Sequence, residues 1–297
     1  MSRFAGWMCV IAVAAIAAAG GWAAWSVRAQ GLARNRAEAA RTAAAAGDDG
    51  PRARRAALEE LFAELQPVKL QNCDWARFGE ANDGGYLLCR NLLQNVGSAY
   101  SYGISGYDGW GCDVSTALKV PVHQYDCFNT KQPVCPTGRP LFHAECIAGS
   151  RSTDADGRLF DSLENQVTRN GDAGKQLVVK MDVEGAEWDS VLQMRDEMLD
   201  RIDQMIFEFH GVARGTDRYL EVVRKLKKHF HVANLHFNNY SCESTIEPFP
   251  AWAYEVTLVS KRLATVDESG GKAAVPHPLD APNHPQAPDC QSVPLSR

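Results

Sequence analysis

The sequence predicts an open α/β fold with a mostly parallel sheet covered by helices on both faces. Short apolar runs alternate with amphipathic stretches, glycine-rich turns follow several of the runs, and carboxylates end two of them. Crossovers between parallel strands are right-handed, which restricts the topology to a doubly wound sheet. The 297 residues, 45% of them hydrophobic, are enough for a core of this size.

The folded region begins with a helix and a hairpin. Leu58–Leu65 carries apolar residues at helical spacing, and Pro67 ends the pattern. Within Trp75–Cys89, the turn signal Asp83-Gly84-Gly85 separates two extended runs. Ser98–Ile104 is then predicted to be the first strand of the main sheet.

The next segment is predicted to alternate between helices and strands. A glycine-rich loop, Ser105–Gly111, leads into a helix that starts near Asp113, which is an acceptable N-cap. Val120–Tyr125 and Leu141–Ala148 are expected to be strands, and Phe160–Asn170 an amphipathic helix.

The last part contains the most informative motif. Leu177–Asp182 is an apolar run that ends in Asp182, Glu184 and a glycine, and passes directly into the helical pattern Ala186–Met194. Ile202–Phe209 is a strand, and Tyr219–His229 is a helix with one apolar face. The final two strands are expected at Phe230–Phe237 and Ala253–Val259.

The segments outside this region have different compositions. Residues 1–28 contain the uncharged run Phe4–Val27, which is long enough to cross a bilayer, so a membrane anchor is favoured over a cleaved signal peptide. Residues 29–56 are Ala- and Arg-rich and are expected to form a stalk. The predicted domain is 57–264, and the Pro- and Gly-rich residues 265–297 are expected to be a disordered tail.

Charge and cysteine content limit the partners and the compartment. A net charge of −5 with no basic stripe gives no sign of a nucleic-acid surface. Nine cysteines favour an oxidising compartment, whereas arginines after the apolar run would place the domain in the cytoplasm. A single-pass membrane protein is therefore expected, with its side of the membrane open. Cys127 and Cys146 follow neighbouring strands and are the first choice for a disulfide.

A nucleoside site is expected at the carboxyl ends of the first strands. Gly103 and Gly106 lie in the first strand-to-helix turn, and Asp126 follows 23 positions after Gly103, close to the spacing of a ribose-binding acid. The glycines lack the GxGxxG order, and nothing specifically provides for a pyrophosphate. A ribose without phosphates fits better, which indicates S-adenosylmethionine.

The motif around Asp182 carries a family resemblance. Lys180-Met-Asp-Val-Glu-Gly-Ala-Glu187 resembles the Lys-Ile-Asp-Val-Glu-Gly-x-Glu signature of FkbM-type S-adenosylmethionine-dependent methyltransferases. Further segments match related members in order: Asn82–Tyr86, Tyr100–Ile104, His123–Asp126, Ile206–His210, Leu235–Tyr240 and Tyr254–Leu258. The resemblance implies a Rossmann-like class I methyltransferase sheet with an antiparallel last strand, and methyl transfer to a hydroxyl of a sugar or small metabolite.

Site residues follow from these two lines of reasoning. The cofactor-binding set is expected to be Tyr102, Gly103, Ser105, Gly106, Asp126 and Asp182. The catalytic candidates are Asp182, Glu184, His210 and His236, because acids and histidines at strand ends can orient an acceptor or take its proton. No metal is assigned, although Glu208 could join Asp182 and the two histidines around a divalent ion.

Two other functions remain open. A nicotinamide-dependent oxidoreductase can be built on a similar sheet, but the glycine order speaks against it. A membrane-tethered binding module could keep the fold without catalysis. The favoured hypothesis is an S-adenosylmethionine-dependent O-methyltransferase whose acceptor is a small molecule or glycan.

Overall fold

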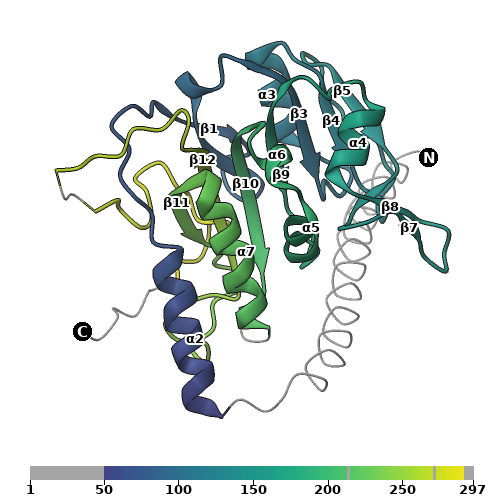
Figure 1. Cartoon of the computed structure of the whole chain (residues 1–297). Coiled ribbons are helices and arrows are strands. Elements are labelled where there is room, and N and C mark those ends of the chain that lie inside the picture. Colours follow the sequence, from purple (N-terminus) through teal and green to yellow (C-terminus); the bar gives the residue numbers. More distant parts are fainter. Residues whose placement is uncertain (1–49, 213–214, 270–271, 291–297) are drawn as a thin grey trace, which may run out of the picture. The chain divides into compact units, whose positions relative to one another are not determined.

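A seven-stranded sheet organises the computed structural model, which describes residues 50–212, 215–269 and 272–290 (Figure 1). Its strands, in spatial order, are β11 (Phe230–Phe237), β12 (Ala253–Ser260), β10 (Ile202–His210), β9 (Gln176–Met181), β3 (Val96–Tyr102), β4 (Val122–Tyr125) and β5 (Pro140–His143). Neighbours run parallel, except that β12 is antiparallel to both β10 and β11. The predicted doubly wound sheet with a reversed last strand is confirmed.

Five helices cover one face of the sheet. This face is apolar: Tyr102, Met181, Phe207 and Phe209 from three strands lie in one buried cluster with helix residues such as Phe62. The helices are α2 (Pro51–Glu64), α4 (Leu163–Arg169), α5 (Glu187–Gln193), α6 (Asp196–Leu199) and α7 (Thr216–His229). Burial of this face supplies most of the apolar area that stabilises the domain.

The opposite face is covered in a different way. Helix α3 (Gly109–Leu118) packs on β3 and β4, where Val114 meets Val122 in a second buried cluster. Over β10 and β12 the cover is an antiparallel hairpin of β1 (Trp75–Gly79) and β2 (Gly85–Cys89). Gln204 on β10 forms two hydrogen bonds with the backbone of Cys89, at 2.9 and 2.8 Å. Polar side chains on the sheet therefore hold the hairpin.

Small elements complete the fold. The short strands β6 (Cys146–Ile147), β7 (Ser152–Thr153) and β8 (Leu159–Asp161) form a separate sheet, and the 3-10 helix η1 spans Arg90–Leu92. Four disulfides pair eight of the nine cysteines: Cys73–Cys89, Cys112–Cys135, Cys127–Cys146 and Cys242–Cys290. The predicted Cys127–Cys146 bridge is confirmed.

Several predicted boundaries were wrong for local reasons. Helix α3 starts at Gly109 rather than near Asp113, because the Asp108 carboxylate caps it by accepting from the Gly111 amide at 2.8 Å. Likewise α4 starts only after Ser162, which caps it, while the preceding residues form β8. The single strand expected at 141–148 is divided between β5 and β6.

The C-terminal segment is not the disordered tail that its composition predicts. Val266 pairs with Leu70 and Lys272 with Val68, and Cys290 is bonded to Cys242. Asn283, only 1% exposed, donates to Glu255 on β12 at 2.7 Å. Residues 272–290 are therefore held against the sheet by hydrogen bonds and a covalent link, and Val275 and Cys290 also pack against the main apolar cluster. Residues 291–297 of the expected tail are outside the described part of the chain.

The expected membrane segment and most of the stalk, up to residue 49, also lie outside the described residues. Within residues 50–212, 215–269 and 272–290, no helix is both long and apolar enough to cross a bilayer. Helix α2 begins at Pro51, so the domain starts earlier than the predicted residue 57.

Candidate functional site

The ends of three strands meet at Gly103. This residue follows β3 with φ of +74°, and a Cβ atom added to it would lie 1.6 Å from the carbonyl oxygen of Asp182 at the end of β9. Its amide donates to the carbonyl of Tyr125 on β4 at 3.0 Å. Only glycine permits this approach. The corner after β3 and the acid corner after β9 therefore share one edge of the sheet.

Asp126, at the end of β4, anchors the neighbouring loop. One carboxylate oxygen accepts from the Ser105 amide at 2.7 Å, and the other accepts from the amides of Phe128 and Asn129 at 2.8 and 2.9 Å. Asn129 in turn donates to the Ser105 carbonyl at 2.7 Å and packs against Gly106. The acid expected to bind ribose is thus joined directly to the glycine loop expected to bind the same ligand.

Tyr102 occupies a different environment from the other expected cofactor residues. Its side chain is fully buried, its hydroxyl donates to Gln166 at 2.7 Å, and its ring stacks on those of Tyr125 and Tyr100 on the helix-covered face. Only the backbone carbonyl of Tyr102 faces the edge, where it accepts from the Asp182 amide at 3.2 Å.

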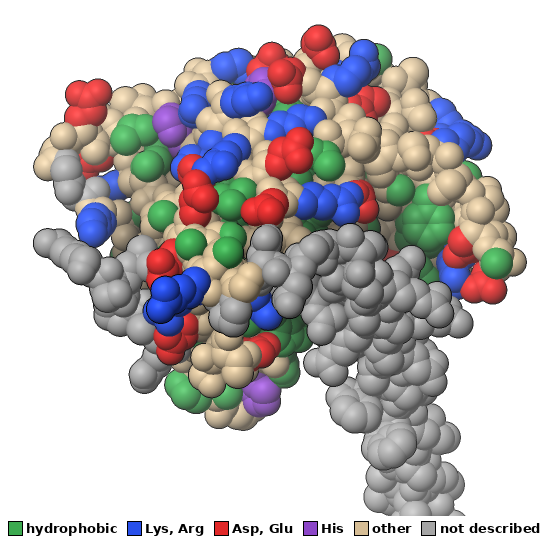
Figure 2. Space-filling view, turned by 60° about the horizontal axis from the view of Figure 1, so that its bottom comes forward, with side chains coloured by type: hydrophobic (Ala, Val, Ile, Leu, Met, Phe, Trp, Pro, Cys, Tyr) green, Lys and Arg blue, Asp and Glu red, His purple; other side chains and the backbone are tan. Residues whose placement is uncertain are grey.

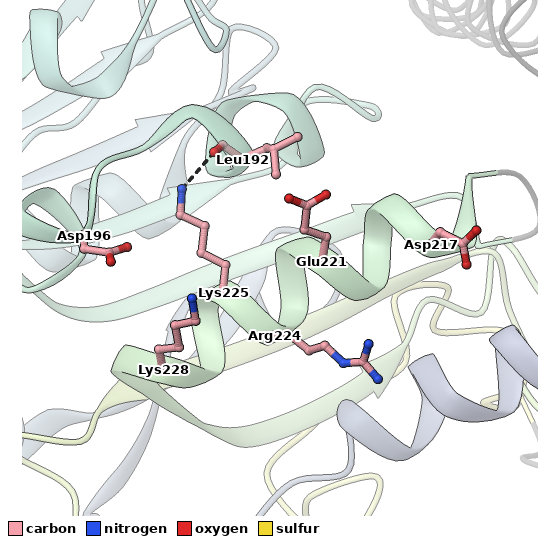
Figure 3. Close-up of a pocket in the computed structure, with 7 residues that line it drawn as sticks. All are labelled: Leu192, Asp196, Asp217, Glu221, Arg224, Lys225 and Lys228. Atoms are coloured by element: carbon pink, nitrogen blue, oxygen red, sulfur yellow. Dashed lines mark hydrogen bonds between the residues drawn. The ribbon is translucent and has the colours of Figure 1, made fainter. Parts of the chain in front are cut away.

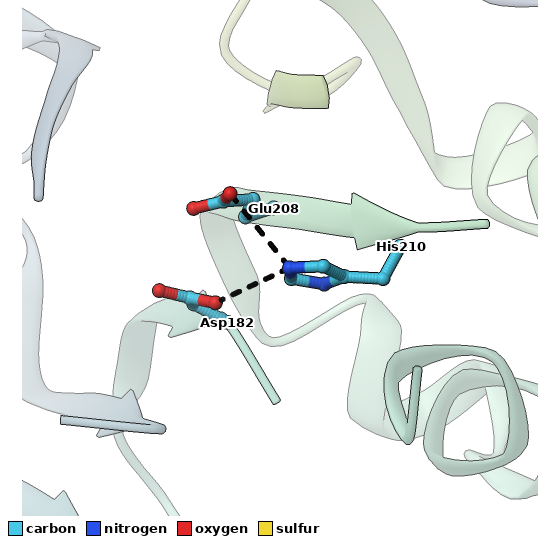
Figure 4. Close-up of side chains that lie close together, drawn as sticks. All are labelled: Asp182, Glu208 and His210. Atoms are coloured by element: carbon cyan, nitrogen blue, oxygen red, sulfur yellow. Dashed lines mark ion pairs between the residues drawn. The ribbon is translucent and has the colours of Figure 1, made fainter. Parts of the chain in front are cut away.

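An acid–histidine cluster follows at the ends of β9 and β10 (Figure 4). Nε2 of His210 lies 3.9 Å from Oδ1 of Asp182, 3.7 Å from Oε1 of Glu208 and 3.7 Å from Oε2 of Glu184. Asp182, Glu208 and His210 each contribute one potential ligand atom, and these three atoms lie within 4.8 Å of one another. Three of the four expected catalytic residues are therefore brought together, with Glu208 added.

His236 lies apart from this group. It is 1% exposed, and its ring nitrogens are 3.0 Å from Glu255 and 3.4 Å from Asp289. These contacts place it beneath the C-terminal segment. Burial lowers its pKa, but hydrogen bonding to Glu255 and the surrounding carboxylates raise the pKa of His236 to about 9. The structure gives it a role in holding the C-terminal segment against β11.

Glu187 supports the turn that carries the acids, a role that the sequence analysis did not assign. It is fully buried and accepts from the amides of Val183 and Gly185, both at 2.8 Å. The turn contains two left-handed residues, Glu184 at φ 56° and Gly185 at φ 107°. Oε1 of Glu187 also lies 3.1 Å from Nδ1 of His210. One side chain therefore fixes both the acid turn and the histidine ring.

Tyr86, Lys180 and Asn238 surround the two carboxylates. The Tyr86 hydroxyl, from the start of β2, lies 3.5 Å from Oδ2 of Asp182 and 3.5 Å from Oε2 of Glu208. Asn238 donates to Oε1 of Glu208 at 2.7 Å, and the Lys180 ammonium is 3.7 Å from Asp182. Tyr86 belongs to the segment Asn82–Tyr86, which resembles the corresponding segment of the methyltransferase family. This resemblance is the sequence feature that could have identified Tyr86 as a site residue.

Burial and like charge shift the pKa values in this cluster. Desolvation raises the pKa of Glu208, and the nearby Asp182 raises it further. Burial alone would lower the pKa of His210, but hydrogen bonding to Glu187 and the charges of the surrounding carboxylates raise it well above its ordinary value. Burial also raises the pKa of Tyr86. The raised pKa values therefore favour the protonated forms of these three side chains.

A surface hollow of about 400 Å³ lies elsewhere, along α7 (Figure 3). It is lined by Leu192, Asp196, Asp217, Glu221, Arg224, Lys225 and Lys228. It contains none of the expected site residues, and the Lys225 ammonium in it is occupied by the Leu192 carbonyl at 2.8 Å. Figure 2 shows acidic and basic side chains interspersed over the displayed face of the molecule. The strand ends remain the candidate site.

Comparison with known proteins gives matches among solved structures alone. No family model and no curated protein matches the chain. The FkbM methyltransferase from Methylobacillus flagellatus KT is 12% identical, with a TM-score of 0.37, and the match covers 55% of this chain and 44% of that one. The chain thus matches less than half the length of that protein.

Two further structures match over similar lengths. The fibrillarin/Nop5p complex is 7% identical with a TM-score of 0.29, covering 64% of this chain and 93% of that one. The E. coli tRNA N6-threonylcarbamoyladenosine dehydratase TcdA, in complex with AMP, is 9% identical with a TM-score of 0.24, covering 62% and 80%. Strand order and the one reversed strand, rather than these low scores, show that the chain has a Rossmann-like, methyltransferase-like α/β fold.

Proposed function

We propose that this protein is an S-adenosylmethionine-dependent methyltransferase that methylates a hydroxyl oxygen of a small molecule or glycan. The observation that carries the proposal is the shared edge at Gly103, where the Asp126 loop and the Asp182 corner meet. In open α/β sheets, ligands bind at the carboxyl ends of the strands, at such a position.

The residues at this edge fit the cofactor. The Oδ2 atom of Asp126 accepts one hydrogen bond, from the Ser105 amide, and a carboxylate oxygen has a second lone pair for a ribose hydroxyl. Gly103 and Gly106 both adopt positive φ, which glycine tolerates, and these two positions of the loop carry no side chain that could obstruct a nucleoside. When bound, the cofactor would supply a methyl group on a positively charged sulfur.

The carboxylates of Asp182 and Glu184 can bind the hydroxyl group that is to be methylated. Methyl transfer forms an O–CH₃ bond as the S–CH₃ bond breaks, and the hydroxyl proton passes to a base. Asp182 is the most exposed member of the Asp182–Glu208–His210 cluster, with a side chain 22% exposed, and Glu184 is 38% exposed. These two carboxylates can accept a hydrogen bond from the hydroxyl and orient it. Such orientation contributes much of the rate in a direct displacement.

His210 is better suited to holding charge than to taking the proton. Burial alone would lower the pKa of His210, but hydrogen bonding to Glu187 and the charges of the surrounding carboxylates raise it above its ordinary value. Its side chain is also only 9% exposed, and its Nδ1 is directed at Glu187. In this proposal His210 positions Asp182 and Glu184, and one of these carboxylates takes the proton.

Calorimetry tests the proposal. We expect the full-length protein to bind S-adenosylhomocysteine at one site, and Asp126→Asn to weaken binding at least about 10-fold, the equivalent of one lost hydrogen bond to a charged group. Asp267→Asn is the matched control, because Asp267 also accepts a backbone amide, from Ser269 at 3.0 Å, but lies away from the strand ends, beside Lys69. Equal binding by wild type and Asp126→Asn would place the ribose elsewhere.

The oxidising environment is part of the same proposal. Four disulfides join segments within the described residues, and such bonds persist in secreted or lumenal proteins. We therefore propose that the domain works in the secretory pathway or outside the cell, held at a membrane by the apolar run Phe4–Val27. Alkylation of free thiols before and after reduction, in protein from the native compartment, would test this.

A further inference from the structure

We propose that Asp182, Glu208 and His210 form a binding site for one divalent transition-metal ion, of which Mn²⁺ is the reference case. The site occupies the acceptor side of the crevice and deepens the proposed function, but metal binding itself needs no cofactor. The inference rests on the placement of three ligand atoms, the partner of the histidine ring, and the local charge.

The three ligand atoms are spaced for one ion. Nε2 of His210 lies 3.9 Å from Oδ1 of Asp182 and 3.7 Å from Oε1 of Glu208. Ligands about 2.1 Å from an ion are roughly 3 Å apart at a right angle and about 4.2 Å apart across it. Both separations from His210 lie between these limits, and all three atoms lie within 4.8 Å of one another. Small rotations of the side chains therefore bring all three atoms to bonding distance.

The histidine is oriented as metal-binding histidines are. Its Nδ1 lies 3.1 Å from Oε1 of Glu187, which is fully buried and fixed by two backbone amides. A carboxylate on one ring nitrogen sets the tautomer so that the other nitrogen is available to a metal. Here that other nitrogen, Nε2, is the one that faces Asp182 and Glu208.

The ligating carboxylates have supporting contacts of their own. Asn238 donates to Glu208 at 2.7 Å, and the Tyr86 hydroxyl lies 3.5 Å from the second oxygen of each carboxylate. The oxygens Oδ1 of Asp182 and Oε1 of Glu208 are therefore turned towards His210. Hydrogen-bonded carboxylates of this kind are the usual surroundings of a metal centre.

The cluster also has an excess of negative charge. Four carboxylates, those of Asp182, Glu184, Glu187 and Glu208, lie within 4 Å of the His210 ring nitrogens. Lys180, 3.7 Å from Asp182, supplies one positive charge, and the four carboxylates outnumber the positive charges even when the His210 imidazole is protonated. Buried or half-buried carboxylates need compensation, and a divalent ion provides it at the point where the ligand atoms converge. One imidazole with two carboxylates suits Mn²⁺ or Zn²⁺ better than Mg²⁺, which prefers oxygen ligands and water.

A bound ion would give the acceptor a place to attach. The acceptor's oxygen would occupy an open coordination position beside Asp182, the most exposed ligand. Coordination lowers the pKa of a bound hydroxyl, as it does for water. The proton would then pass to Glu184, whose side chain is 38% exposed.

Titration calorimetry with MnCl₂ on the chelator-treated, full-length, oxidised protein tests the site. We expect one Mn²⁺ per chain, with Zn²⁺ competing and Mg²⁺ binding more weakly. His210→Gln and Asp182→Asn should each weaken Mn²⁺ binding by at least about 100-fold, and Glu187→Gln by roughly 10–100-fold, as for an outer-shell partner. Pulsed electron paramagnetic resonance should detect one nitrogen ligand in the wild type and none in His210→Gln.

His229→Gln is the matched control. His229, the last residue of α7, also faces two carboxylates, Asp200 at 2.7 Å and Asp196 at 3.4 Å. These two carboxylates belong to the ends of α6 and are well exposed. The His229→Gln protein should bind Mn²⁺ with the same affinity as the wild type. Circular dichroism confirms that each variant folds.

Two results would overturn the site: no saturable Mn²⁺ or Zn²⁺ binding by folded wild-type protein, or wild-type affinity in His210→Gln. Binding of S-adenosylhomocysteine is measured separately. A protein that binds S-adenosylhomocysteine but no metal refutes the metal site alone, whereas one that binds metal but no S-adenosylhomocysteine refutes the proposed function alone.

Discussion

The C-terminal segment offers the sharpest test of the fold, because its order depends on few contacts. Cys290 is bonded to Cys242, and Asn234 on β11 donates to Asp280 at 3.0 Å. Asn239 donates to the carbonyls of residues 284, 287 and 288 at 3.0–3.2 Å. Replacing both cysteines by alanine removes the covalent link while leaving these hydrogen bonds in place.

The size of the effect follows from the length of chain that the disulfide closes. The two cysteines are 48 positions apart. The chain-entropy relation for a loop of this length gives about 4 kcal/mol of stabilisation at 25 °C, through restriction of the unfolded state. The hydrogen bonds to the sheet each contribute about 1 kcal/mol net, so no single one of them replaces the link.

Urea unfolding and limited proteolysis measure the two consequences. We expect Cys242→Ala/Cys290→Ala to lose about 4 kcal/mol in the free energy of unfolding, and residues 272–290 to become cleavable while β12 stays protected. A double variant with wild-type stability, or a wild-type protein already cleaved rapidly within 272–290, would refute the docking of this segment.

Two further predictions concern the strand ends and the pH range. Gly103→Ala should abolish S-adenosylhomocysteine binding and lower the free energy of unfolding by more than about 1 kcal/mol. The reason is that a residue in the left-handed region gains a Cβ atom that collides with the Asp182 carbonyl. Unchanged binding in calorimetry would contradict this prediction. The pKa of His236 is raised from 6.5 to about 9, so its contribution, up to about 3 kcal/mol, is complete below pH 6.5 and lost as pH rises through 9. The groups that face it are Glu255, Asp280 and Asp289. Chemical unfolding from pH 6 to 10 should show this loss, and His236→Gln should remove it; the same pH profile in both proteins would contradict the assignment.

The sheet was predictable because its signals are local. Alternating apolar runs and helical patterns identified all seven strands of the main sheet, and the family resemblance supplied the reversed last strand. The errors occurred where capping decides the outcome. The side chains of Asp108 and Ser162 each accept a hydrogen bond from a backbone amide at the start of a helix. The sequence alone does not distinguish these two capping residues from the polar residues beside them.

The candidate site was predictable in part. Asp182, Glu184 and His210 follow strands whose ends share an edge, so their proximity followed from topology. Glu187 was missed because it lies inside the following helix, and its role depends on the left-handed turn before it. His236 was expected at the same edge, but its side chain is directed at Glu255 and at Asp289 of the C-terminal segment. No local pattern in the sequence indicates that this segment lies there.

The error over residues 272–290 has a general cause. Composition measures how much apolar surface a segment can bury, and by that measure these residues are poor. Their order comes instead from partners elsewhere in the chain, such as Glu255 and Asn239, and from Cys242. Pairing between Cys242 and Cys290 could not be deduced from spacing.

The central claim is that the ends of β3, β4 and β9 hold a sulfonium donor in one crevice, and a crystal structure with S-adenosylhomocysteine tests it most directly. In that structure the ribose hydroxyls should lie at Asp126 and the sulfur on the Asp182 side of Gly103. Density for the ligand at any other place, including the hollow along α7, would contradict the claim.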